Sequence, residues 1–302
     1  MADVRRFLDP AVLEATAPLQ LLARRVTEGG AAGPHRSPNQ GASLEFRQHR
    51  IYVKGDEPRR IDWRVLARSN RFFVKEYDEE TNLRCLLMLD ASGSMGYGAS
   101  RNSKSKFDLA SRIAASLAYL LLANGESVGL ATFSASVCEY LPPSALGSQL
   151  NRVVQLLARA APAGIANPKT AMHAVADRVR RRSLILFISD CFTPIPLLQD
   201  GLARLVHGRH ELVVLRVLHP DEVNFGFRNP VRLRGLEYET VRIVEPAMVR
   251  QQYMSQFQHH TQQVHNACQV IRAQLETFTT DQPLVKSLTR FLQRRMQLIG
   301  GR

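Results

Sequence analysis

Two continuous apolar runs, each followed by an aspartate, stand out in the middle of the chain. Cys85–Leu89 precedes Asp90, and Leu184–Ser189 precedes Asp190. Strands that are buried on both faces of a parallel sheet have continuous apolar sequences of this kind. We therefore predict two central parallel strands, with the two aspartates at their carboxyl ends.

Strand and helix patterns alternate around these runs from residue 84 to residue 218. Alternation at these lengths is typical of a doubly wound α/β sheet. The expected strands are Arg84–Asp90, Ser127–Phe133, Ser136–Tyr140, Leu184–Ser189 and Glu211–Leu218. The expected helices are Phe107–Ala123, Leu146–Arg159, Thr170–Arg181 and Leu197–His207. We predict a three-layer α/β sandwich with a mostly parallel central sheet.

The pattern is less regular at both ends of the chain. After Pro220 we expect a hairpin, a helix, a strand and a last helix: Val231–Glu237 with Thr240–Val244, Pro246–Asn266, Gln269–Leu275 and Pro283–Arg295. Before residue 84 we expect a helix over residues 9–28, a Gly/Pro/Ser-rich stretch, two strands and a short helix: Gly29–Gly41, Glu45–Val53, Phe72–Glu79 and Arg59–Arg68. We assign residues 1–83 to an N-terminal extension and residues 84–302 to the α/β domain.

Composition and charge narrow the functional classes only slightly. The 302 residues are 45% hydrophobic and 22% charged, which is ordinary for a soluble globular protein. A net charge of +13 favours an acidic partner, whether nucleic acid, membrane surface or protein. The four cysteines lack metal-binding spacing, so we expect buried, reduced thiols. Acidic residues and prolines interrupt the N-terminus, and Ile113–Ala123 is too short to span a bilayer, so we expect a cytoplasmic protein.

The chemistry is concentrated in the loop Asp90-Ala91-Ser92-Gly93-Ser94, which directly follows a predicted strand. Ligands of open parallel sheets bind beyond the carboxyl ends of the strands. Here a D-x-S-x-S sequence supplies one carboxylate and two hydroxyls, and Mg²⁺ prefers such oxygen ligands. Thr170, before a predicted helix, and Asp190, after a strand, are expected at the same edge. The alternative is that these residues only cap helices or form turns.

The order Asp90, Ser92, Ser94, Thr170, Asp190 resembles the metal-ion-dependent adhesion site of von Willebrand factor A domains. This resemblance implies direct contacts to Mg²⁺ or Mn²⁺ from Ser92, Ser94 and Thr170. It also implies that the two aspartates act mainly through water and through hydrogen bonds to the hydroxyls. The open metal position would then bind a Glu or Asp of another molecule.

Residues 41–80 resemble the signature of the bacterial "domain of unknown function 58" family. The matching segments are Glu45-Phe46, Arg50–Asp56, Arg60–Trp63, Ala67-Arg68 and Asp78–Glu80, with further likeness at Lys106–Ala110 and Thr280–Leu284. The chain departs from many members at Asn39–Ser43, where they are richer in glycine. The family's genes usually accompany a MoxR-type AAA+ ATPase. The resemblance therefore implies an adaptor that works with this ATPase in chaperone-like maturation of client proteins.

Other functional classes have weaker support. No G-x-S-x-G elbow, H-E-x-x-H motif or phosphate-binding loop is present, so we expect no enzymatic activity. The alternative function is binding to nucleic acid or another acidic surface, with a purely structural metal site. Around Trp63, the charges of Arg50, Asp56, Arg60, Asp62 and Arg68 form either an internal salt-bridge network, which we favour, or a partner-docking surface.

Overall fold

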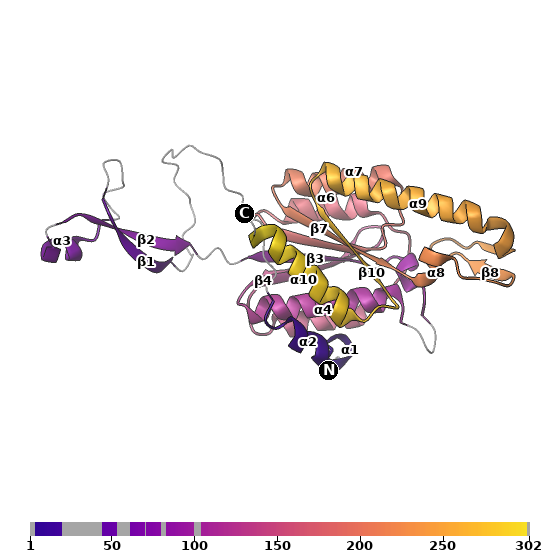
Figure 1. Ribbon diagram of the computed structural model, residues 1–302, viewed down its shortest axis with the longest axis horizontal. Helices are drawn as coiled ribbons and strands as arrows, with labels where there is room; N and C mark the ends of the chain where they lie inside the picture. The colour runs from indigo at the N-terminus through magenta and orange to yellow at the C-terminus, as the bar shows by residue number, and fades with distance from the viewer. Residues whose placement is uncertain are drawn as a thin grey trace. The chain divides into compact units, whose positions relative to one another are not determined.

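The computed structural model describes residues 4–19, 44–52, 61–69, 71–79, 83–99 and 104–300 (Figure 1). Its contacts divide the chain into two units, one formed by Met1–Arg25 with Leu83–Arg302 and the other by Val26–Asn82. The expected extension over residues 1–83 is thus divided, because its first residues pack with the α/β unit. Gly29–Gly41 and most of the Arg50–Asp56 segment lie outside the described residues.

The smaller unit contains an antiparallel strand pair and one short helix. Strand β1 (Leu44–Ile51) pairs with β2 (Phe73–Glu79), and α3 (Trp63–Ser69) lies between them in sequence. Asp62 is buried, and its Oδ1 accepts a hydrogen bond from the Val65 backbone N–H at 3.3 Å. This bond caps the first turn of α3. Trp63 is 60% exposed, and Asp56 and Arg60 lie outside the described residues.

The larger unit is built on a six-stranded sheet of order β10-β7-β6-β3-β4-β5. All neighbours are parallel except β5, which runs antiparallel to β4. The strands are β3 (Arg84–Asp90), β4 (Ser127–Phe133), β5 (Val137–Ser144), β6 (Leu184–Ser189), β7 (Glu211–Leu218) and β10 (Gln274–Thr279). Strands β3 and β6 lie side by side in the centre and are almost completely buried, as their apolar sequences predict.

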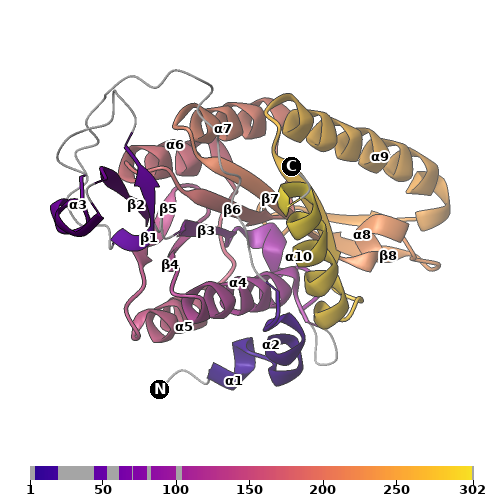
Figure 2. The same ribbon diagram turned by 60° about the vertical axis from the view of Figure 1, so that its left-hand side comes forward.

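Helices cover both faces of this sheet and enclose two apolar cores (Figure 2). One face carries α4 (Lys106–Ala123), α5 (Gln149–Arg159) and α10 (Leu284–Gly300). The other face carries α6 (Pro168–Arg178), α7 (Ile195–His207) and α9 (Pro246–Val270). The predicted three-layer α/β fold with a mostly parallel central sheet is confirmed.

The N-terminal helices α1 (Val4–Phe7) and α2 (Pro10–Thr16) belong to this unit because their apolar side chains join its core. Phe7 and Val12 are buried in the same cluster as residues of α4 and α10. Arg112 on α4 forms an ion pair with Asp9 at 2.9 Å. The expected helix over residues 9–28 ends at Thr16 within the described residues, and residues 20–28 are not described.

Near the C-terminus, one expectation needs correction and another is confirmed. Residues 269–273 are not a strand, since α9 continues to Val270 and ends in a turn where Arg272 has a φ of 56°. The strand begins only at Gln274, and apolar periodicity in so short a segment does not separate a helix end from a strand. The expected hairpin is present as β8 (Val231–Arg234) and β9 (Val241–Val244), preceded by the short helix α8 (Pro220–Asn224).

Two further expectations concern cysteines and membrane spans. Cys85, Cys191 and Cys268 are buried free thiols, but Cys138 is exposed on the edge strand β5. In the described parts of the chain, every helix is too short or too polar to cross a bilayer.

Candidate metal centre

The candidate centre lies at the carboxyl ends of β3 and β6. Asp90 is the last residue of β3, and Asp190 directly follows β6. These strands are hydrogen-bonded parallel neighbours, with Leu89 paired to Ile188. The chain therefore brings the two aspartates to one edge of the sheet, although they are far apart in sequence.

Asp90 is held by hydrogen bonds to both of its carboxylate oxygens. Oδ1 accepts from the Ser92 backbone N–H at 2.9 Å, and Oδ2 accepts from the Ser189 hydroxyl at 2.6 Å. Burial, and after it the nearby charge of Asp190, together raise the pKa of Asp90 from 3.8 to about 7. A negative charge at this position is costly for the folded protein unless a cation lies close to it.

The two serine hydroxyls of the loop face each other. Ser92 Oγ and Ser94 Oγ are 3.2 Å apart, in a tight turn over Gly93–Gly96. Adjacent ligands of an octahedral Mg²⁺ ion are about 3 Å apart, because each lies near 2.1 Å from the metal. A hydrogen bond from the Gly93 N–H to the Gly164 carbonyl at 2.8 Å holds this loop in place. The spacing of the hydroxyls thus fits two neighbouring positions of an octahedral ion.

Asp190 takes part in a buried ion pair that sequence reasoning did not find. Lys106 Nζ donates to Asp190 Oδ2 at 2.7 Å and to Glu222 Oε1 at 2.6 Å, and the lysine side chain is completely buried. Burial alone would lower the pKa of Lys106, but the two carboxylates raise it above its ordinary value. The lysine therefore stays charged and offsets part of the negative charge beside the candidate centre.

The position of Lys106 follows from the start of α4. Ser105 and Asp108 form a capping box, in which the Ser105 hydroxyl accepts from the Asp108 N–H at 3.0 Å. The Asp108 carboxylate in turn accepts from the Ser105 N–H at 3.1 Å. This reciprocal cap fixes the first turn of α4 and so holds Lys106 at its first position. The signal available in the sequence was the cap, but not the partners of the lysine.

Thr170 is less closely associated with the other candidate residues. It lies in the first turn of α6, is exposed, and its backbone N–H donates to Asn167 Oδ1 at 3.2 Å. Within the described residues, its hydroxyl forms no hydrogen bond to Asp90, Ser92 or Ser94. Hydrogen bonds thus connect Asp90 with Ser92 and Ser92 with Ser94. Asp190 interacts with Asp90 through the repulsion of their charges. The role of Thr170 remains a prediction.

The β8–β9 hairpin lies against the loop of the candidate centre. A Cβ atom on Gly93 would be only 2.2 Å from the Leu236 carbonyl oxygen, so the backbone of the hairpin turn is in direct contact with this loop. The next residue, Glu237, accepts a long hydrogen bond at 3.5 Å from the Ala166 N–H. Packing against the hairpin backbone therefore requires a glycine at position 93.

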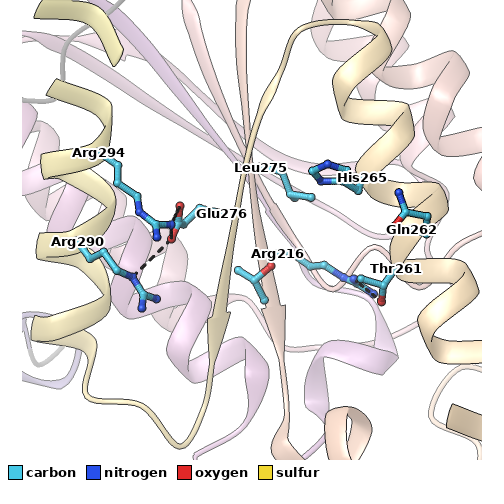
Figure 3. Close-up of a pocket in the computed structure, with 9 residues that line it drawn as sticks. Arg216, Thr261, Gln262, His265, Leu275, Glu276, Arg290 and Arg294 are labelled. Atoms are coloured by element: carbon cyan, nitrogen blue, oxygen red, sulfur yellow. Dashed lines mark hydrogen bonds and ion pairs between the residues drawn. The ribbon is translucent and has the colours of Figure 1, made fainter. Parts of the chain in front are cut away.

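A separate pocket of 560 Å³ lies at the sheet edge, next to β10 and between α9 and α10 (Figure 3). Arg216, Arg290 and Arg294 contribute to its lining, and Glu276 forms ion pairs with the latter two. Arg216 also reaches the candidate centre, because its Nε donates to the Asp190 carbonyl at 3.2 Å. The pocket is thus connected to the strand end that carries Asp190, but it contains none of the predicted ligands.

The donor set determines which metal ion would fit. In the described part of the chain, no three His, Cys, Asp or Glu side chains are grouped as a metal site. A bound ion would therefore depend on the serine hydroxyls, with the carboxylates already engaged in hydrogen bonds. Hard oxygen ligands with few direct charges suit Mg²⁺ or Mn²⁺ better than zinc or copper. The residues fit a hydroxyl-based magnesium or manganese site.

Comparison with curated proteins finds mycobacterial relatives of similar length. The chain is 27% identical over 299 residues to the uncharacterized protein Rv1480 of Mycobacterium tuberculosis and to the uncharacterized protein Mb1516 of Mycobacterium bovis. Each alignment covers 97% of this chain and 93% of the relative.

Two solved structures are similar to this chain at low sequence identity. BatB from Bacteroides thetaiotaomicron has a TM-score of 0.41 and 11% identity, covering 71% of this chain and 99% of that one. An aerotolerance-related membrane protein from Bacteroides fragilis has a TM-score of 0.41 and 15% identity, covering 72% and 99%. The profile described as "Protein of unknown function DUF58" matches residues 48–263. Since this match spans more than half of the chain and includes the candidate centre, the protein belongs to the DUF58 family.

Proposed function

We propose that this protein is a metal-ion-dependent protein–protein interaction module. In this proposal Mg²⁺ or Mn²⁺ binds at Ser92 and Ser94, and the ion takes up a carboxylate of a partner protein. The observation that carries the proposal is the hydroxyl pair, 3.2 Å apart, beside two aspartates at the carboxyl edge of the sheet. Thr170 would supply a further oxygen from α6.

The charge distribution supports carboxylate binding. The direct ligands proposed here are neutral hydroxyls, so the ion would keep most of its positive charge. Asp90 and Asp190 are engaged by Ser189 and Lys106, which leaves them to hold water or orient the hydroxyls. A cation with few charged ligands attracts an external carboxylate more strongly than one already surrounded by carboxylates. An acidic residue of a partner would complete the coordination.

The surface next to the centre supports a protein partner. Several large apolar side chains of the β8–β9 hairpin and the start of α9 are exposed: Leu233, Leu236, Tyr238, Val241, Ile243 and Met248. Ile243 is 81% exposed. Contiguous apolar side chains at the surface often mark protein interaction sites. An acidic side chain that reaches the metal could be accompanied by apolar contacts to this hairpin.

From the family resemblance we propose a MoxR-type AAA+ ATPase, or a client protein of this ATPase, as the partner. The role would be that of an adaptor in chaperone-like maturation, without catalysis by this chain. The supporting features are the family membership and the donor set of the candidate centre.

The test is partner capture from native lysate with immobilised protein. Wild type in Mg²⁺ is compared with wild type in EDTA and with an Asp90→Ala/Ser94→Ala variant, and the retained proteins are identified by mass spectrometry. Retention of an AAA+ ATPase by metal-loaded wild type alone supports the proposal. Equal retention in all three conditions contradicts it.

A further inference from the structure

We propose that Glu237 is an internal ligand of the candidate metal centre. In the free protein its carboxylate would occupy the metal position that a partner carboxylate takes, so that partner binding is an exchange of one carboxylate for another. This inference rests on the proposed metal-dependent function and deepens it. It assigns to the β8–β9 hairpin a role that the D-x-S-x-S pattern alone does not suggest.

The backbone contact brings the hairpin turn to the centre. Gly93 lies between Ser92 and Ser94, the two hydroxyl residues, and only the absence of a side chain allows the Leu236 carbonyl so close to it. The turn itself is held by two hydrogen bonds, Gly235 N–H to the Thr240 carbonyl and Thr240 N–H to the Tyr238 carbonyl, both at 2.7 Å. The residue that follows Leu236 is therefore fixed beside the serine loop.

The side chain of that residue is an acid with an unused oxygen. Glu237 Oε2 accepts only the long bond from Ala166, and Oε1 is shielded from solvent without a hydrogen-bond partner among the described residues. Ala166 is two residues from Gly164, whose carbonyl accepts the Gly93 N–H. The carboxylate thus contacts a segment that is itself hydrogen-bonded to the serine loop.

A shielded carboxylate oxygen needs a cation or a donor. Leaving a buried acceptor unpaired costs about 1–3 kcal/mol, and more when the group is charged. No ion pair joins Glu237 to a cationic side chain among the described residues. A divalent ion held by Ser92 and Ser94 would supply the missing positive charge. The same oxygen would then fill a coordination position that otherwise holds water.

The hairpin offers a matched control. Glu239 lies two residues further along the same turn and is exposed to solvent. Glu237→Gln and Glu239→Gln each remove one negative charge without changing the size of the side chain. They therefore alter the net charge of the hairpin equally, and only the first removes the proposed ligand.

The experiment uses Mn²⁺ as the probe and measures the relaxation of water protons together with the dissociation constant of the ion. Relaxation per bound ion reports how many exchangeable waters the ion carries. In E237Q we expect a higher relaxation per ion than in wild type, because water replaces the carboxylate. We also expect the dissociation constant of Mn²⁺ to rise about tenfold or more. Added acetate should lower the relaxation of E237Q again. E239Q should match wild type in all three respects.

The outcomes separate this inference from the function on which it rests. If wild type binds Mn²⁺ in a manner that Ser92→Ala/Ser94→Ala abolishes, while E237Q equals wild type in relaxation and affinity, the internal ligand is refuted and the metal centre stands. If wild type shows no Mn²⁺ binding at the serines, both are refuted. Thermal melting of the metal-free variants establishes that each is folded before the comparison.

Discussion

The buried ion pair of Lys106 offers a prediction whose magnitude follows from the structure. Lys106→Met keeps an unbranched apolar side chain of nearly the same length but removes the ammonium group that lies 2.7 Å from Asp190 and 2.6 Å from Glu222. The lysine is fully buried and both carboxylates are largely buried, so two negative charges would be left without their partner. Breaking a buried pair in this way costs about 3–5 kcal/mol. This is a large part of the free energy of unfolding of an ordinary domain.

The assay is urea unfolding of wild type and K106M, each in EDTA and in Mg²⁺. In EDTA the midpoint of K106M should fall clearly below that of wild type. Mg²⁺ should stabilise K106M more than wild type, because the ion then offsets a charge at Asp190 that the lysine no longer balances. Adding Glu222→Gln to K106M removes one of the two uncompensated charges and should restore part of the loss.

Lys169→Met is the matched control, since Lys169 and Asp200 form an ion pair at 3.5 Å in which both side chains are about half exposed. Exposed pairs contribute little to stability, so K169M should unfold close to wild type. The reasoning is refuted if K106M unfolds at the same urea concentration as K169M. It is also refuted if Mg²⁺ stabilises K106M and wild type equally.

Two further predictions concern the serine loop and its aspartate. Gly93→Ala places a Cβ atom against the Leu236 carbonyl and should destabilise the protein by about 1–3 kcal/mol. Gly147→Ala is the control, because a Cβ atom there meets nothing within 4 Å and stability should not change. Thermal unfolding compares the two variants, and equal melting temperatures would contradict the packing of Gly93 against the hairpin. In metal-free protein the raised pKa of Asp90 makes the folded state bind a proton more tightly than the unfolded state. Its stabilising contribution is therefore complete below pH 3.8 and is lost as the pH rises through about 7. Asp90→Asn should flatten this decline in melting temperatures recorded in EDTA, and an unchanged slope would exclude Asp90 as its cause.

Much of the fold could be predicted because local patterns determine it. The continuous apolar sequences of β3 and β6 require burial on both faces, which a parallel sheet with two helical layers provides. The aspartates that end these strands then meet at one edge as a consequence of topology. The family could also be predicted from the sequence signature, and the DUF58 match over residues 48–263 confirms it.

The features that remained hidden depend on contacts between distant residues. Lys106 is 84 residues from Asp190 and 116 from Glu222, and neither distance has a local signal in the sequence. The contact between Leu236 and Gly93 also joins residues that are far apart in the sequence. A hairpin pattern predicts the two strands but not the surface on which the hairpin lies. The sequence predicts the start of β10 too early, because the end of α9 and the following strand have similar apolar residues.

The central claim, that the serine loop holds a divalent cation, is tested most directly by calorimetric titration of Mg²⁺ and Mn²⁺ into metal-free protein. Wild type and a Ser92→Ala/Ser94→Ala variant are compared, because this change removes both hydroxyls and leaves Asp90 and Asp190 in place. The account predicts one ion bound per chain in wild type and no binding in the variant. Equal binding by both proteins, or no binding by wild type, would contradict it.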